Sequence, residues 1–238
     1  MAKKAKRKNK AVSTKRRAIK YGAAGAAVLL LVPVILSAAY ALVDPPVTTL
    51  MLWRSAQGQE RRWEWRSLKD MSPHMVAAVV SAEDGQFCHH HGVDWGQVRK
   101  VIETVRHDPD KPVRGASTIT MQAARTLFLW PSRSVVRKAF EVPLALWLDL
   151  VLSKRRLLEI YLNVVEWAPG VYGAGAASRF HFGRDVRRLS RTQAALLAAT
   201  LPAPFKRRPG KPTTKLTRLA GVYTKRMETI SPYLDCVK

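Results

Sequence analysis

Residues 21–43 are an uncharged stretch of 23 residues that directly follows a basic N-terminus. As an α-helix this stretch would be roughly 35 Å long, whereas the hydrocarbon core of a bilayer is about 30 Å thick. Pro33 lies within the stretch, and a membrane helix tolerates proline better than a soluble helix does. We therefore expect one transmembrane anchor over residues 21–43, so that the folded domain is built from the residues after it.

The charge of the N-terminus predicts how this anchor is oriented. Residues 1–20 contain ten Lys or Arg and no acidic residue. The positive-inside rule keeps such a tail in the cytoplasm, which places the rest of the chain on the outer side of the membrane. A cleaved signal peptide is the alternative, because Ala39-Tyr40-Ala41 resembles a processing site. The uncharged stretch is longer than a usual signal core of about 7–15 residues, which favours the anchor.

The overall charge indicates an anionic partner. The chain carries a formal net charge of +24, and fewer than half of these charges belong to the N-terminal tail. Such a charge suits either nucleic acid or a membrane with acidic lipids. The uncharged stretch favours the membrane, so we expect no nucleic-acid partner. Cys88 and Cys236 could pair in an oxidising periplasm, but we expect Cys88 to be a small packed residue near the functional site.

Residues 44–69 carry Trp53, Trp63 and Trp65 among several arginines. Aromatic rings and basic groups gather at the boundary between lipid and water, which predicts a stalk close to the membrane. The alternative is that these residues form ordinary strands packed on the domain.

Helical patterns dominate residues 70–238, which we expect to form one mainly α domain. Ser72-Pro73 is a good helix opening, and the helix it begins delivers Glu83 near its C-terminal end. Further helices are expected over residues 95–105, from Ser117 or Thr118 onward, over 136–152 with a kink at Pro143, over 154–163, and after a capping box of Ser190 and Gln193.

Glu83 and Glu141 are the candidate catalytic residues, because each carboxylate lies among polar and basic groups. A pair of carboxylates is the usual equipment for transfer at the anomeric carbon of a sugar. Glu83 is close in sequence to Asp84 and Phe87, and a carboxylate between a second acid and an apolar wall tends to have a raised pKa. That property suits a general base. The alternative is that Glu83 is a solvated acid at a helix end and that His90 is simply packed.

The residues between the two glutamates suit the oxygens of phosphates and sugars. Residues 115–120 combine small residues, hydroxyls and a helix N-terminus, although Ser and Thr also cap helices that bind nothing. Four cations then precede Glu141, namely Arg125, Arg133, Arg137 and Lys138. A basic run is usually a solvated face, but clustered Arg and Lys are also what a diphosphate leaving group needs. Together these features predict a glycosyl transfer that expels a phosphate.

Five segments, in this order, resemble the peptidoglycan glycosyltransferase family, and in particular its monofunctional biosynthetic transglycosylases. They are Glu83-Asp84-x-x-Phe87-x-x-His90-x-Gly92, Gly115-x-Ser117-Thr118-Ile119-Thr120-x-Gln122, Arg137-Lys138-x-x-Glu141, Lys154-Arg155-Arg156-Leu157-Leu158-Glu159-x-Tyr161-Leu162-Asn163, and Ala194-Ala195-Leu196-Leu197-Ala198 with Pro202 and Pro204.

The resemblance implies a lysozyme-like glycosyltransferase domain with a membrane-associated jaw subdomain. It implies that lipid II is polymerised into glycan strands, as the acceptor 4-hydroxyl attacks a lipid-linked donor and releases undecaprenyl diphosphate. Glu83 would be the general base, and Glu141 would position the acceptor or stabilise the diphosphate region. The implied substrate-binding residues are Asp84, Phe87 and His90 at the first site, and Ser117, Thr118, Gln122, Arg125, Arg133, Arg137 and Lys138 around the donor.

The chain departs from the family pattern at Arg125-Thr126, where Lys-Asn is usual, and at Gln193, where Glu is usual. Arginine keeps the charge of lysine but binds in a different geometry, so the donor phosphate site is expected to differ in detail. Gln193 can still complete a capping box.

Several expectations concern ligands and partners. No cofactor is required, although a divalent cation could bridge the substrate diphosphate. Three adjacent histidines, residues 89–91, cannot easily form one tetrahedral metal site. We expect lipid II, the growing strand and the membrane as partners, with other proteins of wall synthesis or division also possible. Neither Ser-x-x-Lys nor Lys-Thr-Gly occurs, so no transpeptidase is expected. The alternatives are a lytic enzyme, which needs no diphosphate site, and a basic binding protein without catalysis.

Overall fold

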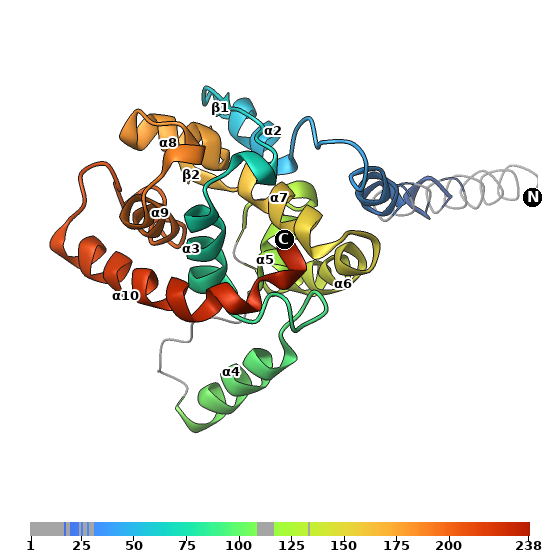
Figure 1. Cartoon of the computed structure of the whole chain (residues 1–238). Helices are drawn as coiled ribbons and strands as arrows, with labels where there is room; N and C mark the ends of the chain where they lie inside the picture. The colour runs from blue at the N-terminus through green and yellow to red at the C-terminus, as the bar shows by residue number, and fades with distance from the viewer. Residues whose placement is uncertain are drawn as a thin grey trace, which may run out of the picture.

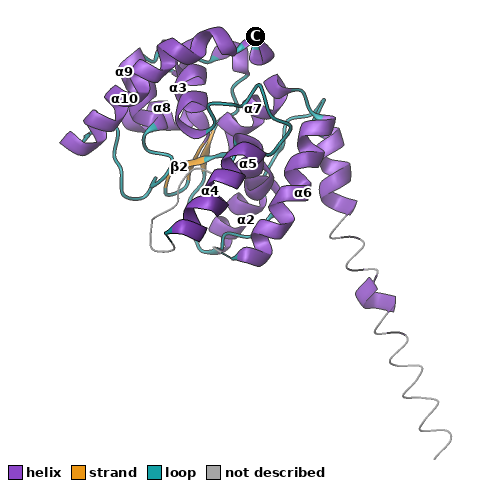
Figure 2. Cartoon of the chain, turned by 90° about the horizontal axis from the view of Figure 1, so that it is seen from below, coloured by secondary structure: helices purple, strands orange, loops and turns teal. Residues whose placement is uncertain are grey.

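The computed structural model describes residues 17, 20–23, 25, 28, 31–108, 117–132 and 134–238. Helices account for most of this part of the chain, and one small sheet lies among them (Figure 2). The mainly α fold expected from the sequence is therefore confirmed.

The helices follow one another along the chain, with connections of different lengths. They are α2 (Thr49–Ala56), α3 (Pro73–Glu83), α4 (Trp95–His107), α5 (Ile119–Phe128), α6 (Val135–Val151), α7 (Lys154–Val164), α8 (Gly173–Phe182), α9 (Arg191–Ala198) and α10 (Thr214–Ile230). Short 3-10 turns are η1 (Leu68–Asp70), η2 (Val186–Arg188), η3 (Ser231–Tyr233) and η4 (Asp235–Val237). In the sheet, β3 (Val171–Tyr172) pairs in parallel with β1 (Arg62–Trp63) and antiparallel with β2 (Glu166–Ala168).

The core joins two groups of helices. α3 packs against α9 and α10, and α5 packs against α6 and α7 (Figure 1). Most of α7 is buried, with Leu157, Leu158 and Ile160 fully enclosed. Burying each such side chain contributes about 1.5–3 kcal/mol. By contrast, α4 has no buried residue and lies at the edge of the molecule.

Local signals in the sequence set several helix boundaries. Ser72 caps α3 by accepting a hydrogen bond from the His74 backbone, and Pro73 is the first helical residue. Ser190 and Gln193 form the expected capping box of α9. Pro143 lies inside α6, as the pattern indicated. These boundaries confirm the helices expected around the two glutamates.

Much of the segment 44–69 packs on the domain. Thr49, the first residue of α2, donates a hydrogen bond from Oγ1 to the Leu127 carbonyl at 2.7 Å. Trp63 in β1 donates from Nε1 to the Asn163 carbonyl at 2.9 Å. Of the two interpretations of this segment, packing on the domain describes Trp63, whereas Trp53 on α2 is half exposed.

The expected anchor is only partly described. Within the described residues, no helix combines the length and the apolar character needed to cross a membrane. Parts of residues 21–43 and most of the tail 1–20 lie outside the described residues. Residues 31–39 are helical, and this end of the segment contacts the domain. Trp147 of α6 donates to Ser37 Oγ at 2.8 Å, and the Tyr40 ring stacks on Phe128 with centroids 6.2 Å apart.

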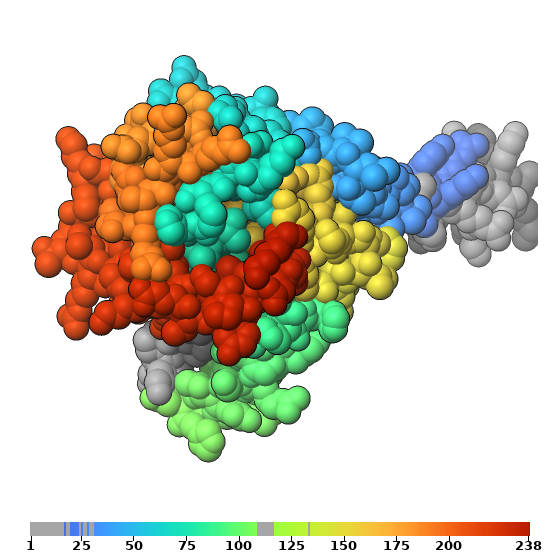
Figure 3. All heavy atoms as spheres, viewed as in Figure 1, coloured from blue at the N-terminus to red at the C-terminus, as the bar shows by residue number. Residues whose placement is uncertain are grey.

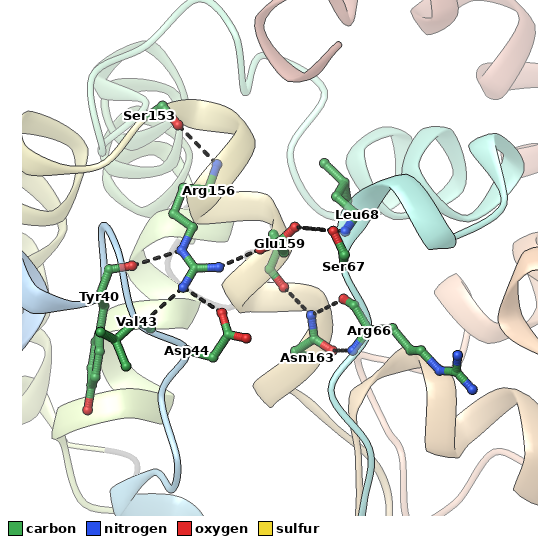
Figure 4. A network of polar contacts seen from close by, with 10 residues as sticks. All are labelled: Tyr40, Val43, Asp44, Arg66, Ser67, Leu68, Ser153, Arg156, Glu159 and Asn163. Atoms are coloured by element: carbon green, nitrogen blue, oxygen red, sulfur yellow. Dashed lines mark hydrogen bonds and ion pairs between the residues drawn. The ribbon is translucent and has the colours of Figure 1, made fainter.

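Polar side chains along one face of α7 hold two earlier segments of the chain (Figure 4). Arg156 donates to the carbonyls of Tyr40 and Val43 at 2.8 and 2.9 Å. It also forms ion pairs with Asp44, at 2.7 Å, and with Glu159. Two helical turns after Arg156 on α7, the amide of Asn163 bonds to both backbone groups of Arg66. Such spacing places Arg156, Glu159 and Asn163 on one side of the helix.

Cys88 and Cys236 form a disulfide between residues that are 148 positions apart, with Cα atoms 5.7 Å apart. The expectation that Cys88 is simply a small packed residue is therefore wrong. Spacing alone did not predict the pair, because the fold must first bring the chain's last turn beside the loop after α3.

Candidate active site

Glu83 is the last residue of α3 and lies beside α5. Its Oε2 accepts a hydrogen bond from Gln122 Nε2 at 2.9 Å, and Gln122 Oε1 accepts one from the Tyr161 hydroxyl at 3.0 Å. The other carboxylate oxygen, Oε1, is buried and has no hydrogen-bond partner among the described residues. Three elements, α3, α5 and α7, therefore fix this carboxylate while leaving one of its oxygens free for another group.

The surroundings of Glu83 favour proton uptake. Burial raises the pKa of its carboxyl, the hydrogen bond from Gln122 and the charge of Arg125 lower it, and the charge of Asp84 raises it. Burial prevails, so the pKa lies above the usual glutamate value. Burial also raises the pKa of Tyr161, which keeps its hydroxyl protonated as the donor to Gln122. A fixed carboxylate with a raised pKa suits a general base.

Asp84 supports the loop that follows Glu83. Its carboxylate is buried, bonds to His90 Nε2 at 2.9 and 3.0 Å, and accepts from the Ile119 backbone N–H at 2.9 Å. Ile119 begins α5, so an acidic group sits at a helix N-terminus, where it is stabilised. Phe87 is buried as well and meets the His90 ring edge to face. Contacts among Asp84, Phe87 and His90 therefore stabilise the loop from the buried side.

A cavity of about 670 Å³ opens beside Glu83. Its lining includes Asp84, Ser117 and Thr118 from the predicted site. Ser117 Oγ is buried and has no partner among the described residues. Thr118 differs, because its hydroxyl caps α5 and donates to the Gly92 carbonyl at 2.6 Å. Two residues that line the cavity, Glu83 and Ser117, thus each carry a buried oxygen without a hydrogen-bond partner among the described residues.

Glu141 belongs to a second cluster, on α6. The side chain is 1% exposed and forms ion pairs with Arg137 and, at 3.2 Å, with Lys138. Arg137 is also buried and donates from Nε to the Ser132 carbonyl. Because the ion pair with Arg137 lies inside the protein, Glu141 holds the two cations in place.

Arg125 connects the two clusters electrostatically. Its charge lowers the pKa of Glu83 on one side and the pKa values of Arg137 and Lys138 on the other. For both of these cations burial is the larger cause, and the pKa of Lys138 falls to about 8. Concentrated positive charge of this kind favours binding of an anion with several oxygens. Arg133, the remaining predicted cation, lies outside the described residues.

Arg125 and Thr126, two of the departures from the family pattern, lie on α5. Arg125 occupies the position between the clusters, where its charge is retained. Thr126 is buried and donates from Oγ1 to the Gln122 carbonyl at 2.9 Å, so its hydroxyl is bonded to the backbone of α5 itself.

The three adjacent histidines have three different surroundings. His89 faces the Tyr233 ring, His90 pairs with Asp84, and His91 lies 3.5 Å from Asp149. Across the described parts of the chain, no group of three or more His, Cys, Asp or Glu side chains is arranged to hold a metal ion.

Sequence patterns missed the contribution of the C-terminal helix. Arg226, Thr229, Ile230 and Tyr233 line the cavity together with Glu83. They lie far from Glu83 along the chain and outside all five motifs, so no sequence pattern connected them with the site.

Comparison with known proteins identifies the family of the chain. The family model described as Transglycosylase matches residues 50–228. A protein of Nitrobacter winogradskyi named biosynthetic peptidoglycan transglycosylase is 47% identical over 212 residues, covering 89% of this chain and 92% of the relative. Proteins of the same name from Brucella suis and Rhizobium etli are 48% and 50% identical, covering 89% and 81% of this chain and 94% and 82% of the relatives. The chain therefore belongs to the transglycosylase family and is a glycosyltransferase enzyme.

Proposed function

We propose that this enzyme polymerises lipid II into the glycan strands of peptidoglycan, with Glu83 as the general base. The observation that carries the proposal is the state of Glu83. Its carboxylate is held by one hydrogen bond, has a raised pKa, and keeps a second oxygen unpartnered beside a cavity large enough for sugar rings. Buried polar atoms without partners are rare in folded proteins, and a catalytic role is one of the explanations for them.

The reaction assigned to this site is a displacement at the donor's anomeric carbon. Glu83 takes the proton of the acceptor 4-hydroxyl as the oxygen forms its bond to that carbon. The bond between the anomeric carbon and the diphosphate oxygen breaks, and the electron pair leaves with the diphosphate. The ionised form of Glu83 is the active one, since only that form can accept a proton.

The cations of α5 and α6 suit the departing diphosphate. Arg125, Arg137 and Lys138 concentrate positive charge beyond Glu83, and Glu141 fixes the last two. Such groups stabilise negative charge that develops on a leaving group. A hydrolase of sugar chains has no leaving diphosphate, so this cluster favours the transferase. The reaction needs no resident cofactor, although a divalent cation could arrive with the diphosphate.

We further propose that the enzyme acts at the cell envelope, held by an anchor over residues 21–43 with the domain outside the cytoplasm. Two observations support this location. The Cys88–Cys236 disulfide is typical of oxidising compartments. Apolar side chains of the neighbouring α6 remain exposed, Val135 and Leu150 by 87% and 77%, as expected for a jaw in contact with lipid. Transpeptidation is left to other proteins.

The decisive experiment is polymerisation of labelled lipid II by the detergent-solubilised full chain, comparing the wild type with Glu83→Gln. Glu103→Gln is the matched control, because Glu103 is an exposed glutamate on α4. We expect polymer from the wild type and from the control. We expect a loss of about 100-fold or more in Glu83→Gln, the usual contribution of a general base.

Equal polymerisation by Glu83→Gln would refute the assignment of the base. Absence of polymer from a folded wild type would refute the proposed reaction. The departure from the family pattern at Arg125-Thr126 would then be the first feature to test. Release of short sugars from preformed strands would instead support a lytic enzyme.

A further inference from the structure

The last ten residues of the chain form part of the cavity at Glu83, although they follow the family match, which ends at residue 228. Thr229 and Ile230 complete α10, and Tyr233 lies in η3. All three line the same cavity as Glu83 and Ser117. Arg226 lines the cavity beside them and lies within the matched residues, so this wall is supplied only in part by residues beyond the family match.

Three kinds of contact hold this C-terminal segment in place. The Cys88–Cys236 disulfide joins it to the loop after α3. Arg155 of α7 donates to the Val237 carbonyl at 2.8 Å, and the side chains of Leu234 and Val237 are buried in the core. Figure 3 shows the C-terminal residues, in the darkest red, lying on the surface between the teal region of α3 and the yellow region of α6 and α7.

The disulfide connects the wall to the catalytic loop itself. Cys88 follows Glu83 by five residues and lies between Phe87 and His90, which brace that loop. The next residue, His89, brings its ring to within 6.1 Å of the Tyr233 ring, centroid to centroid. The disulfide thus adds a covalent link between the loop after Glu83 and the C-terminal wall of the cavity, in addition to the packing of α10 on α3.

Two side chains of this wall have the chemistry to bind a sugar that carries an anionic group. Tyr233 is 61% exposed and offers a flat apolar face with a polar hydroxyl. Arg226 is the one basic side chain among the described residues that line the cavity. Its guanidinium can form two parallel hydrogen bonds to a carboxylate or a phosphate.

We infer that Arg226 and Tyr233 bind the acceptor sugar and its attached anionic group, and that the Cys88–Cys236 disulfide positions them opposite Glu83. The inference rests on the proposed function. The acceptor belongs on this side because Glu83 must reach its hydroxyl. The cations suited to the leaving diphosphate, Arg137 and Lys138, are not among the residues that line this cavity.

The test is the dependence of the initial polymerisation rate on lipid II concentration in Tyr233→Ala and Arg226→Gln, with the disulfide intact. We expect each change to raise the half-saturating concentration about five- to tenfold while the maximal rate changes little. The matched controls are Phe180→Ala, an exposed aromatic on α8, and Arg218→Gln, an exposed arginine on α10. Both should behave as the wild type.

A second comparison tests the disulfide. Cys88→Ser with Cys236→Ser should raise the half-saturating concentration in the same direction, at a temperature where a melting curve shows the variant folded. Adding Tyr233→Ala to this double variant should then raise the half-saturating concentration by a smaller factor than the same change does in the wild type, because the disulfide acts through Tyr233.

Wild-type concentration dependence in both Tyr233→Ala and Arg226→Gln would overturn the inference. So would fully additive effects of the tyrosine and cysteine changes. The proposed function fails separately, since it requires polymer from the wild type that is lost in Glu83→Gln.

Discussion

Glu141→Gln tests whether Glu141 is held as an internal counter-charge. The substitution keeps the shape of the side chain and removes its charge, which leaves Arg137 without compensation. Glu141 is 1% exposed and Arg137 is 8% exposed, so water has little access to the charge that remains. Removing one member of a buried ion pair costs about 3–5 kcal/mol, whereas an exposed pair contributes about 0–1 kcal/mol. Lys138 is 42% exposed along its side chain and adds little to this cost.

We therefore expect Glu141→Gln to lower the free energy of unfolding by about 3–5 kcal/mol. The assay is denaturant unfolding in detergent, followed by tryptophan fluorescence. The matched variant is Arg137→Met with Glu141→Leu, which removes both charges and should be more stable than Glu141→Gln alone. A loss below about 1 kcal/mol in the single variant would refute the buried-pair reasoning. Loss of polymerisation at unchanged stability would instead place Glu141 in the reaction.

Three further predictions follow from the same geometry. Replacing both cysteines by serine should lower the free energy of unfolding by up to about 5 kcal/mol, because the disulfide closes a loop of 148 positions; an unchanged denaturation midpoint would contradict this. The rate should fall with decreasing pH as Glu83 takes up a proton, at a higher pH than for an ordinary glutamate. The hydrogen bond from Gln122 lowers the pKa of Glu83, so Gln122→Met, which removes this bond, should raise that pKa and move the fall in rate to still higher pH. A shift to lower pH would exclude Glu83 as the titrating group. Inhibition by inorganic pyrophosphate should weaken as the pH rises through about 8, where Lys138 loses its charge. Lys138→Arg should remove this pH dependence of the inhibition. An identical pH profile in the variant would argue against Lys138 as the group that binds the pyrophosphate.

Local signals explain why much of the fold was predictable. Ser72-Pro73 and the pair of Ser190 and Gln193 act within one helical turn, so their effect can be read directly from neighbouring residues. The position of Glu83 at the end of α3 followed from such a boundary.

Long-range contacts explain what could not be predicted. The Cys88–Cys236 pair and the place of Tyr233 in the cavity wall depend on how α10 packs on α3, which no local pattern encodes. Thr118 shows a related difficulty. Its hydroxyl could bind substrate or cap α5, and only the three-dimensional structure shows that it is engaged with the Met121 and Gly92 backbones.

The contacts of Arg156 have a consequence for where the enzyme can work. Arg156 holds residues 40–44 on α7, and the same helix carries Tyr161, which reaches Glu83 through Gln122. With the anchor that we propose, the span from the outer lipid surface to the base is therefore a fixed length, whereas a flexible linker would allow a range of lengths. A lipid-linked sugar can react only if it rises to that height above the bilayer. With that anchor, the depth at which the enzyme meets its substrate follows from the packing of residues 37–44 on α5, α6 and α7.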